Sequence, residues 1–223
     1  MSYSNMTASK RNQLRVKCFC SNFVNSYYID PKNRMFEWTF YNSNGSNPAV
    51  MSKAQRYAED YQQMKERNIG LLFWGNTGTG KSYTAACIAN YLIDMGNPVF
   101  MISFGRILRE QFAAEDKSEY LEHIIHYPML ILDDLGAERD SAYAQEVVYS
   151  VIDGRYLTGK PLIITSNLTL DELKAPSDMR YSRIYDRILE MCVPIHFEGT
   201  SQRQDLFKSK RDMARDLLES EAK

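Results

Sequence analysis

Gly75-Asn76-Thr77-Gly78-Thr79-Gly80-Lys81-Ser82 is the stretch of this 223-residue chain that decides its fold. It matches G-x-x-x-x-G-K-[ST] at every constrained position, which is the pattern of a phosphate-binding P-loop. The apolar run over 69–74 directly before it predicts a buried strand, and residues 83–95 directly after it have a helical pattern. A P-loop lies between such a strand and such a helix, so a chance match by a glycine-rich turn is the weaker alternative.

The residue types of this stretch suit the binding of phosphate. Its three glycines allow successive backbone N–H groups to point at an anion, and the following helix adds the positive end of its dipole. Lys81 is expected to contact the β- and γ-phosphates of a nucleoside triphosphate, and the hydroxyl of Ser82 to ligate Mg²⁺. The predicted nucleotide-binding residues are Gly75, Asn76, Thr77, Gly78, Thr79, Gly80, Lys81, Ser82 and Tyr83.

Length and composition suit one globular α/β domain of ordinary size with a small appendage, or two small domains. Apolar residues make up 44% and charged residues 25% of the chain, and the net charge of −1 gives no overall attraction to nucleic acid. No apolar run approaches the ~20 residues of a membrane helix, and no signal-peptide core is present, so we expect a cytoplasmic protein without membrane association. Cys18 and Cys20 alone are a weak zinc signal, because zinc sites need four ligands.

Apolar strands alternate with helical patterns along the rest of the chain. Further strands are predicted at 99–103, 129–132, 161–167 and 193–197, with helices between them and an amphipathic helix over 202–220. This alternation predicts an α/β fold whose five-stranded, mostly parallel sheet is covered by helices on both faces. Residues 1–47 are expected to form a partly flexible N-terminal arm, extended over 34–41, and residues 48–223 the nucleotide-binding domain with its C-terminal helix.

Polar side chains end two of the predicted strands. Asp133 and Asp134 follow the third strand, and Asn167 follows the fourth. Because parallel strands bind ligands at their carboxyl ends, Asp133 is expected to share Mg²⁺ with Ser82, and Asp134 to polarise the attacking water. Asn167 is expected to bond the γ-phosphate or the water. The alternatives are a helix cap or solvated loop for the acids and a turn for the asparagine.

Three arginines share one face of the helix predicted before the fifth strand. Arg180, Arg183 and Arg187 are spaced three and four residues apart. Such a stripe is usually a solvated face. The alternative is an arginine finger that reaches the γ-phosphate bound by a neighbouring subunit.

Together these motifs resemble those of the AAA+ ATPases of the DnaC/DnaI helicase-loader group, which also includes the IstB transposition helpers. The similarity extends from about Phe36 to Arg203 and covers Gly75 to Ser82, Leu132 to Gly136, Thr165 to Asn167, Arg183 to Ile188 and Ser201 to Arg203.

The resemblance implies roles for the asparagine after the fourth predicted strand and for the arginines that follow it in the chain. Asn167 is then the sensor-1 residue, and Arg187 the arginine finger across a subunit interface, with Arg183 as second choice. Arg203 is the sensor-2 arginine that contacts phosphate. The expected catalytic residues are thus Asp134, Asn167, Arg187 and Arg203, the metal ligands Ser82 and Asp133, and the cofactors ATP and Mg²⁺.

The function that the resemblance implies is ATP-dependent loading or remodelling of a replicative DnaB-type helicase on single-stranded DNA, with self-association through the interface that carries Arg187. One alternative is an IstB-like ATPase that assists a transposase on DNA. Another is a small-molecule P-loop kinase, which would need no arginine from a neighbour.

Two features depart from the family pattern. Glu is more common than Asp at position 134, and the shorter side chain predicts slow hydrolysis. The 47 residues before the nucleotide-binding domain are also fewer than the separate helicase-binding domain of the loaders would need.

The resemblance also implies binding of single-stranded DNA by the ATPase ring. Between the second and third predicted strands lie two cations and two aromatic rings suited to it: Arg106, Arg109, Phe104 and Phe112. Both phenylalanines fall on the apolar face of a predicted helix, so periodicity favours core packing for them. The basic residues of the last predicted helix alternate with acidic ones, which is typical of a solvated face.

Overall fold

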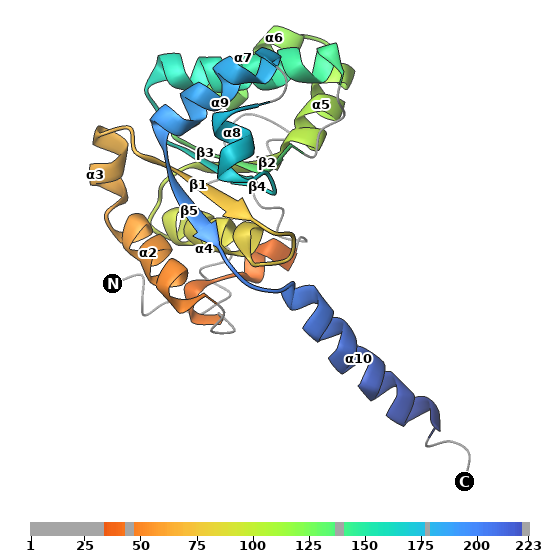
Figure 1. Ribbon diagram of the computed structural model, residues 1–223. Helices are drawn as coiled ribbons and strands as arrows, with labels where there is room; N and C mark the ends of the chain where they lie inside the picture. The colour runs from red at the N-terminus through yellow and green to blue at the C-terminus, as the bar shows by residue number, and fades with distance from the viewer. Residues whose placement is uncertain (1–33, 43–46, 137–140, 177–178, 220–223) are drawn as a thin grey trace.

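The computed structural model describes residues 34–42, 47–136, 141–176 and 179–219 (Figure 1). Its sheet has the strand order β2-β3-β4-β1-β5, and each pairing between neighbours is parallel. The strands are β1 (Gly70–Gly75), β2 (Val99–Ser103), β3 (Met129–Leu135), β4 (Leu162–Ser166) and β5 (Cys192–Phe197). The predicted α/β fold with a five-stranded parallel sheet is confirmed.

Helices cover both faces of this sheet, as Figure 1 shows. One face is covered by α2 (Pro48–Glu59), α3 (Tyr61–Glu66) and α4 (Lys81–Asp94). The other is covered by α5 (Phe104–Ala113), α6 (Lys117–Ile125), α7 (Ala142–Thr158), α8 (Leu170–Lys174) and α9 (Met179–Met191). The last helix, α10 (Gln202–Glu219), projects away from the body.

Strand β1, which lies between β4 and β5, is apolar on both sides because both sides are buried. Leu71 and Phe73 pack toward α4, while Leu72 packs toward α7 and α9, following the two-residue period of a strand. Parallel strands buried in this way have near-continuous apolar sequences. Because the body of such a strand is buried, polar and charged side chains occur at its ends, and the candidate site lies at the carboxyl ends of the strands.

The segment before α2 differs from the extended structure expected over 34–41. Residues Arg34–Glu37 and Phe40–Asn42 form 3₁₀ turns instead. The side-chain amide of Asn90 on α4 donates to the carbonyls of Met35 at 3.0 Å and Trp38 at 2.7 Å. A buried amide thus satisfies backbone groups that a strand would pair with a neighbour. Residues 1–33, with Cys18 and Cys20, lie outside the described residues, and the division at residue 47 stays a prediction.

The packing expected for the two phenylalanines of α5 is right for one and wrong for the other. Phe104 is fully buried, whereas 73% of Phe112 is exposed. Gln111 takes the inward position at this end of α5 and accepts a hydrogen bond from the Tyr143 hydroxyl at 3.1 Å. One residue further along the helix, Phe112 is rotated out of the core.

No helix in the described ranges combines the length and the apolar character that crossing a membrane requires.

A fully buried arginine ties α7 to the turns around it. Arg155 donates from Nη1 to the carbonyls of Ile125 at 2.8 Å and Tyr127 at 2.5 Å, and from Nη2 to the carbonyl of Pro161. Burial lowers the pKa of the guanidinium to about 10. The guanidinium donates to three backbone carbonyls, so it holds the end of α6 and the start of β4 against one helix.

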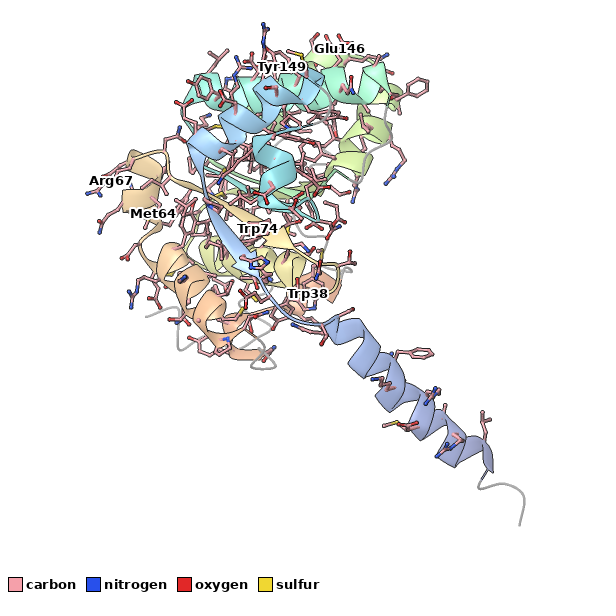
Figure 2. The ribbon with its side chains drawn as sticks, viewed as in Figure 1. Trp38, Met64, Arg67, Trp74, Glu146 and Tyr149 are labelled. Carbon is pink, nitrogen blue, oxygen red and sulfur yellow. The ribbon has the colours of Figure 1, made fainter. Side chains whose placement is uncertain are left out.

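Replacing Arg155 should therefore destabilise the fold. We expect Arg155→Met to lower the free energy of unfolding in urea by about 2–4 kcal/mol, because buried carbonyls lose their donors. Arg67→Met is the control, since Arg67 is exposed (Figure 2) and should change stability by no more than about 0.5 kcal/mol. Equal stability of the two variants would contradict this role for Arg155.

Candidate nucleotide-binding site

The loop between β1 and α4 has the backbone conformation that its glycines allow. Gly75 has φ +136° and Gly78 has φ +82°, a region that residues with a Cβ rarely adopt. Other segments of the protein also lie very close to both glycines. A Cβ added at Gly75 would lie 2.4 Å from the Phe197 carbonyl oxygen, and one added at Gly78 would lie 2.1 Å from Ser201 Oγ. The loop is thus held by β5 and by the segment that follows it.

Lys81 lies buried inside this loop, at the first turn of α4. Its Nζ donates to the carbonyls of Gly75 and Asn76, each at 2.7 Å, and to Oδ1 of Asn167 at 2.8 Å. The ammonium therefore faces the concave side of the loop, where phosphate would bind. Asn167 is 86 residues away in the chain, so two of the predicted site residues are brought into direct contact.

Asp133 lies beside the loop at the end of β3, with 9% of its surface exposed. Its carboxylate accepts from the hydroxyl of Thr165 at 2.6 Å and from the hydroxyl of Ser82. Burial raises the pKa of Asp133, while the bonds from Thr165 and Ser82 and the charge of Lys81 act in the opposite direction and the charge of Asp134 adds to the rise.

The donor set fits Mg²⁺. The Ser82 hydroxyl and the Asp133 carboxylate already contact each other, so both can reach one cation. Within the ranges that the structure describes there is no cluster of three or more His, Cys, Asp and Glu side chains able to hold a metal. Mg²⁺ at phosphoryl-transfer sites needs no such cage, because phosphate oxygens and water complete its six ligands.

Asp134 is exposed and differs in backbone conformation from the residues around it. Its φ is +60°, in the left-handed region, and its N–H donates to the Thr165 hydroxyl at 3.0 Å. The two predicted acids thus share one partner, but only Asp133 is buried.

Two predicted catalytic arginines are not placed in this site. Arg187 lies on α9 against α7: it forms an ion pair with Asp153, and its guanidinium lies 5.2 Å from the centre of the Tyr149 ring and 5.3 Å from that of Tyr156. Its side chain is 24% exposed, whereas Arg183 is exposed. The side chains of Arg180 and Arg203 lie outside those that the structure describes. The roles predicted for the arginines stay predictions.

Three further contacts to the loop were not predicted as site residues. The backbone N–H of Gln202 donates to the Gly78 carbonyl at 3.0 Å, and its side-chain amide to the Thr79 carbonyl at 3.2 Å. Asn47 also donates to Thr79, at 3.2 Å. Gln202 belongs to a family motif, which was its only sequence signal, while Asn47 lies in a turn-rich stretch that gives none.

Tyr83, the last predicted nucleotide-binding residue, contacts the segment before α2. Its hydroxyl donates to the Thr39 carbonyl at 3.0 Å, and its ring centre lies 5.2 Å from that of Trp38. Burial raises the pKa of Tyr83 to about 12, so the phenol stays protonated as a donor at neutral pH. Figure 2 shows Trp38 near the carboxyl end of the sheet, below Trp74 of β1.

A P-loop on a parallel sheet, with an amide at the end of the neighbouring strand and an acid at the end of the strand beyond it, defines a P-loop nucleotide-binding protein. The chain belongs to the family of IstB-like ATP binding proteins, whose model matches residues 31–211.

Relatives and solved structures agree with the resemblance found in the sequence. The replicative helicase loader DnaI of Bacillus subtilis (strain 168) is 28% identical over 180 residues, which are 74% of this chain and 58% of DnaI. The replicative helicase loader DnaC of Escherichia coli (strain K12) is 27% identical over 145 residues, 62% of this chain and 56% of DnaC. The chain thus spans just over half the length of these relatives.

A crystal structure of DnaI superimposes with a TM-score of 0.63 at 24% identity, covering 75% of this chain and 92% of that one. It supports the fold alone, which is that of an α/β domain built on a parallel sheet.

The close approach of Ser201 to the loop predicts a specific effect of adding a methyl group. We expect Gly78→Ala to weaken ATP binding, measured by calorimetry, by about tenfold or more, because the displaced N–H groups no longer face the phosphates. Gly96→Ala is the matched control: Gly96 has φ +81°, but a Cβ there meets nothing within 4 Å. Both variants should lose about 1 kcal/mol of stability through left-handed strain, and only the first should lose affinity.

A second substitution separates the clash from the strain. Adding Ser201→Gly to Gly78→Ala removes the group that the new methyl would meet, so ATP affinity should partly recover. If Gly78→Ala binds ATP as well as Gly96→Ala does, the contact with Ser201 is unimportant to the loop.

Proposed function

We propose that this protein is an Mg²⁺-dependent ATPase that loads or remodels a replicative DnaB-type helicase on single-stranded DNA. The observation that carries the ATPase part is the meeting of Lys81, Asn167 and the Ser82–Asp133 pair at the ends of three neighbouring strands. The names of the loader relatives support the helicase part. In this proposal residues 48–223 are the ATPase domain and residues 1–47 its N-terminal arm.

The chain's own residues divide the chemistry among them. Lys81 exchanges its carbonyl partners for the β- and γ-phosphates, and loop N–H groups bind the same oxygens. Ser82 and Asp133 would hold Mg²⁺, which would supply positive charge against the phosphates. Asp134 orients and polarises the attacking water, and Asn167 leaves Lys81 to bond the γ-phosphate or that water. Because Asp134 is shorter than the Glu more common in this position, we expect slow turnover.

The base of the nucleotide has a candidate site beside Tyr83. Trp38 and Tyr83 form an aromatic pair next to the loop, and Asn47 joins the same segment to the Thr79 carbonyl. The stretch from Phe36 to Tyr41 was expected to form one wall of the adenine pocket. The placement of Trp38 supports that proposal, while the side chain of Phe36 lies outside those described.

A small exposed aromatic and cationic cluster supports the single-stranded DNA part. Phe112 is 73% exposed, Lys117 Nζ lies 5.6 Å from the centre of its ring, and Tyr143 packs edge-on at 6.5 Å. Bases stack on such rings while cations attract the backbone. Arg109 is exposed on the same helix, whereas Arg106 is paired with Glu110 at 2.6 Å and is less available.

The test of this function is assembly. Mixed with a DnaB-type helicase, Mg-ATP and single-stranded DNA, the wild-type protein should co-elute with both on size exclusion. Lys81→Ala should abolish tight ATP binding and this co-elution, because it removes the cation at the phosphates. Phe112→Ser should reduce retention of DNA while leaving ATP affinity unchanged.

Other outcomes identify the alternatives. Binding to neither helicase nor single-stranded DNA refutes the loader proposal. A preference for duplex DNA and a transposase favours an IstB-like helper instead, and phosphate transfer to a small acceptor favours a kinase.

Self-association through Arg187 requires a change of partners. Within its own subunit the guanidinium is held by Asp153 and two tyrosine rings, contacts that together are worth about 1–2 kcal/mol. Contact with a neighbour's γ-phosphate offers a stronger charge-assisted interaction. We therefore propose that Arg187 leaves Asp153 when subunits assemble around ATP.

Mixing two inactive variants tests whether Arg187 acts across subunits. Lys81→Ala cannot hold ATP but keeps its arginine, and Arg187→Ala holds ATP but lacks the finger. Each alone should lack ATPase activity, and the mixture should recover part of it. Arg183→Ala is the control and should remain active; if it is the inactive one, the finger is Arg183. Full activity of monomeric Arg187→Ala refutes a role in trans.

A further inference from the structure

One buried hydroxyl contacts both acids of the site. Thr165 is fully buried in β4, two residues before Asn167. Its Oγ1 donates to Asp133 Oδ1 at 2.6 Å and accepts from the backbone N–H of Asp134 at 3.0 Å. A hydroxyl has one proton to donate and two lone pairs to accept with, so both bonds form at once.

The N–H that Thr165 accepts belongs to an extra residue in β3. Leu132 pairs with Ile164 and Leu135 with Ser166, so three steps along β3 correspond to two along β4. This is the count of a β-bulge, which leaves one residue without its partner in the ladder. Asp134, with φ +60°, lies within it, and the Thr165 hydroxyl takes the place of the missing carbonyl.

The bulge decides which side chain of β3 enters the core. In a regular strand Leu132 and Asp134 would face the same side, because side chains alternate. Here Leu132 and Leu135 are both buried in the cluster beneath α7 and α9, and Asp134 is exposed. Without the extra residue, the strand would direct Asp134 into an apolar interior, where a charge is costly.

We propose that Thr165 is a positioning residue that couples the two acids: through one hydroxyl it orients Asp133 toward Mg²⁺ and holds the bulge that presents Asp134 to the reacting phosphate. This inference rests on the ATPase function proposed above. In this proposal the short side chain of Asp134 faces the phosphate because of the bulge in β3, and Thr165 of the neighbouring strand β4 holds that bulge in place.

The test compares Thr165→Val, which keeps the shape but removes the hydroxyl, with Thr165→Ser, which keeps the hydroxyl. Thr165→Val should lower kcat by about tenfold or more and raise the Mg²⁺ concentration needed for half-maximal activity, with the affinity for metal-free ATP unchanged. Thr165→Ser should restore both. In hydrogen exchange, the Asp134 amide should be protected in wild type and Thr165→Ser and should exchange faster in Thr165→Val.

Ser166→Ala is the matched control. Ser166 is equally buried in β4, but its hydroxyl donates to the Leu135 carbonyl at 2.8 Å and contacts neither acid. It should lose stability and keep kcat.

The outcomes separate this inference from the function on which it rests. If Thr165→Val loses stability but keeps kcat and amide protection, as Ser166→Ala does, Thr165 has only a structural role and the inference is wrong. If Asp134→Asn turns over ATP at the wild-type rate, the catalytic role proposed for Asp134 is wrong, and the proposed function has to be revised rather than the contact made by Thr165. The exchange rate of the Asp134 amide tests the hydrogen bond to the Thr165 hydroxyl directly, without depending on ATPase activity.

Discussion

The contact between the Lys81 ammonium and the Asn167 side chain is the interaction on which the site depends. It joins the end of β4 to the loop after β1, two strands that are neighbours in the sheet but 86 residues apart at these positions. A buried ammonium is costly unless it is hydrogen-bonded, and two loop carbonyls also accept from it. The same three acceptors that stabilise Lys81 keep it where phosphate would bind.

Charge balance around Lys81 explains the arrangement of the acids. Asp133 is buried beside the lysine and has the hydroxyls of Ser82 and Thr165 as donors, so its charge is compensated although burial raises its pKa. A second buried carboxylate would have no comparable partner. The bulge at Asp134 leaves that group in solvent, close in sequence but in a different environment. Neighbouring carboxylates in different environments are suited to different tasks, here metal binding and water activation.

Local patterns were sufficient for the elements and for the motifs on them. The strand over 99–103 and the P-loop were predicted within a residue, because continuous apolar runs and glycine spacing are local signals. The segment over 34–41 was wrongly expected to be extended, since its backbone is paired by Asn90 of a distant helix. Phe112 was misplaced because periodicity does not show where a helix turns away from the core. Thr165 and Gln202 lie in family motifs, and Asn47 in a turn-rich stretch, but none of the three carries a local signal for the contacts it makes.

The sequence by itself determined a P-loop nucleotide-binding protein: the residues of Gly75 to Ser82 and the two acids near the carboxyl end of β3 specify that chemistry wherever they fold. The tertiary structure decided how those residues work together. It placed Asn167 on Lys81, Thr165 between the two acids, and Arg187 against Asp153 rather than in the site. Strand order, register and a one-residue bulge set these contacts, and all three arise from packing between segments that are far apart in the chain.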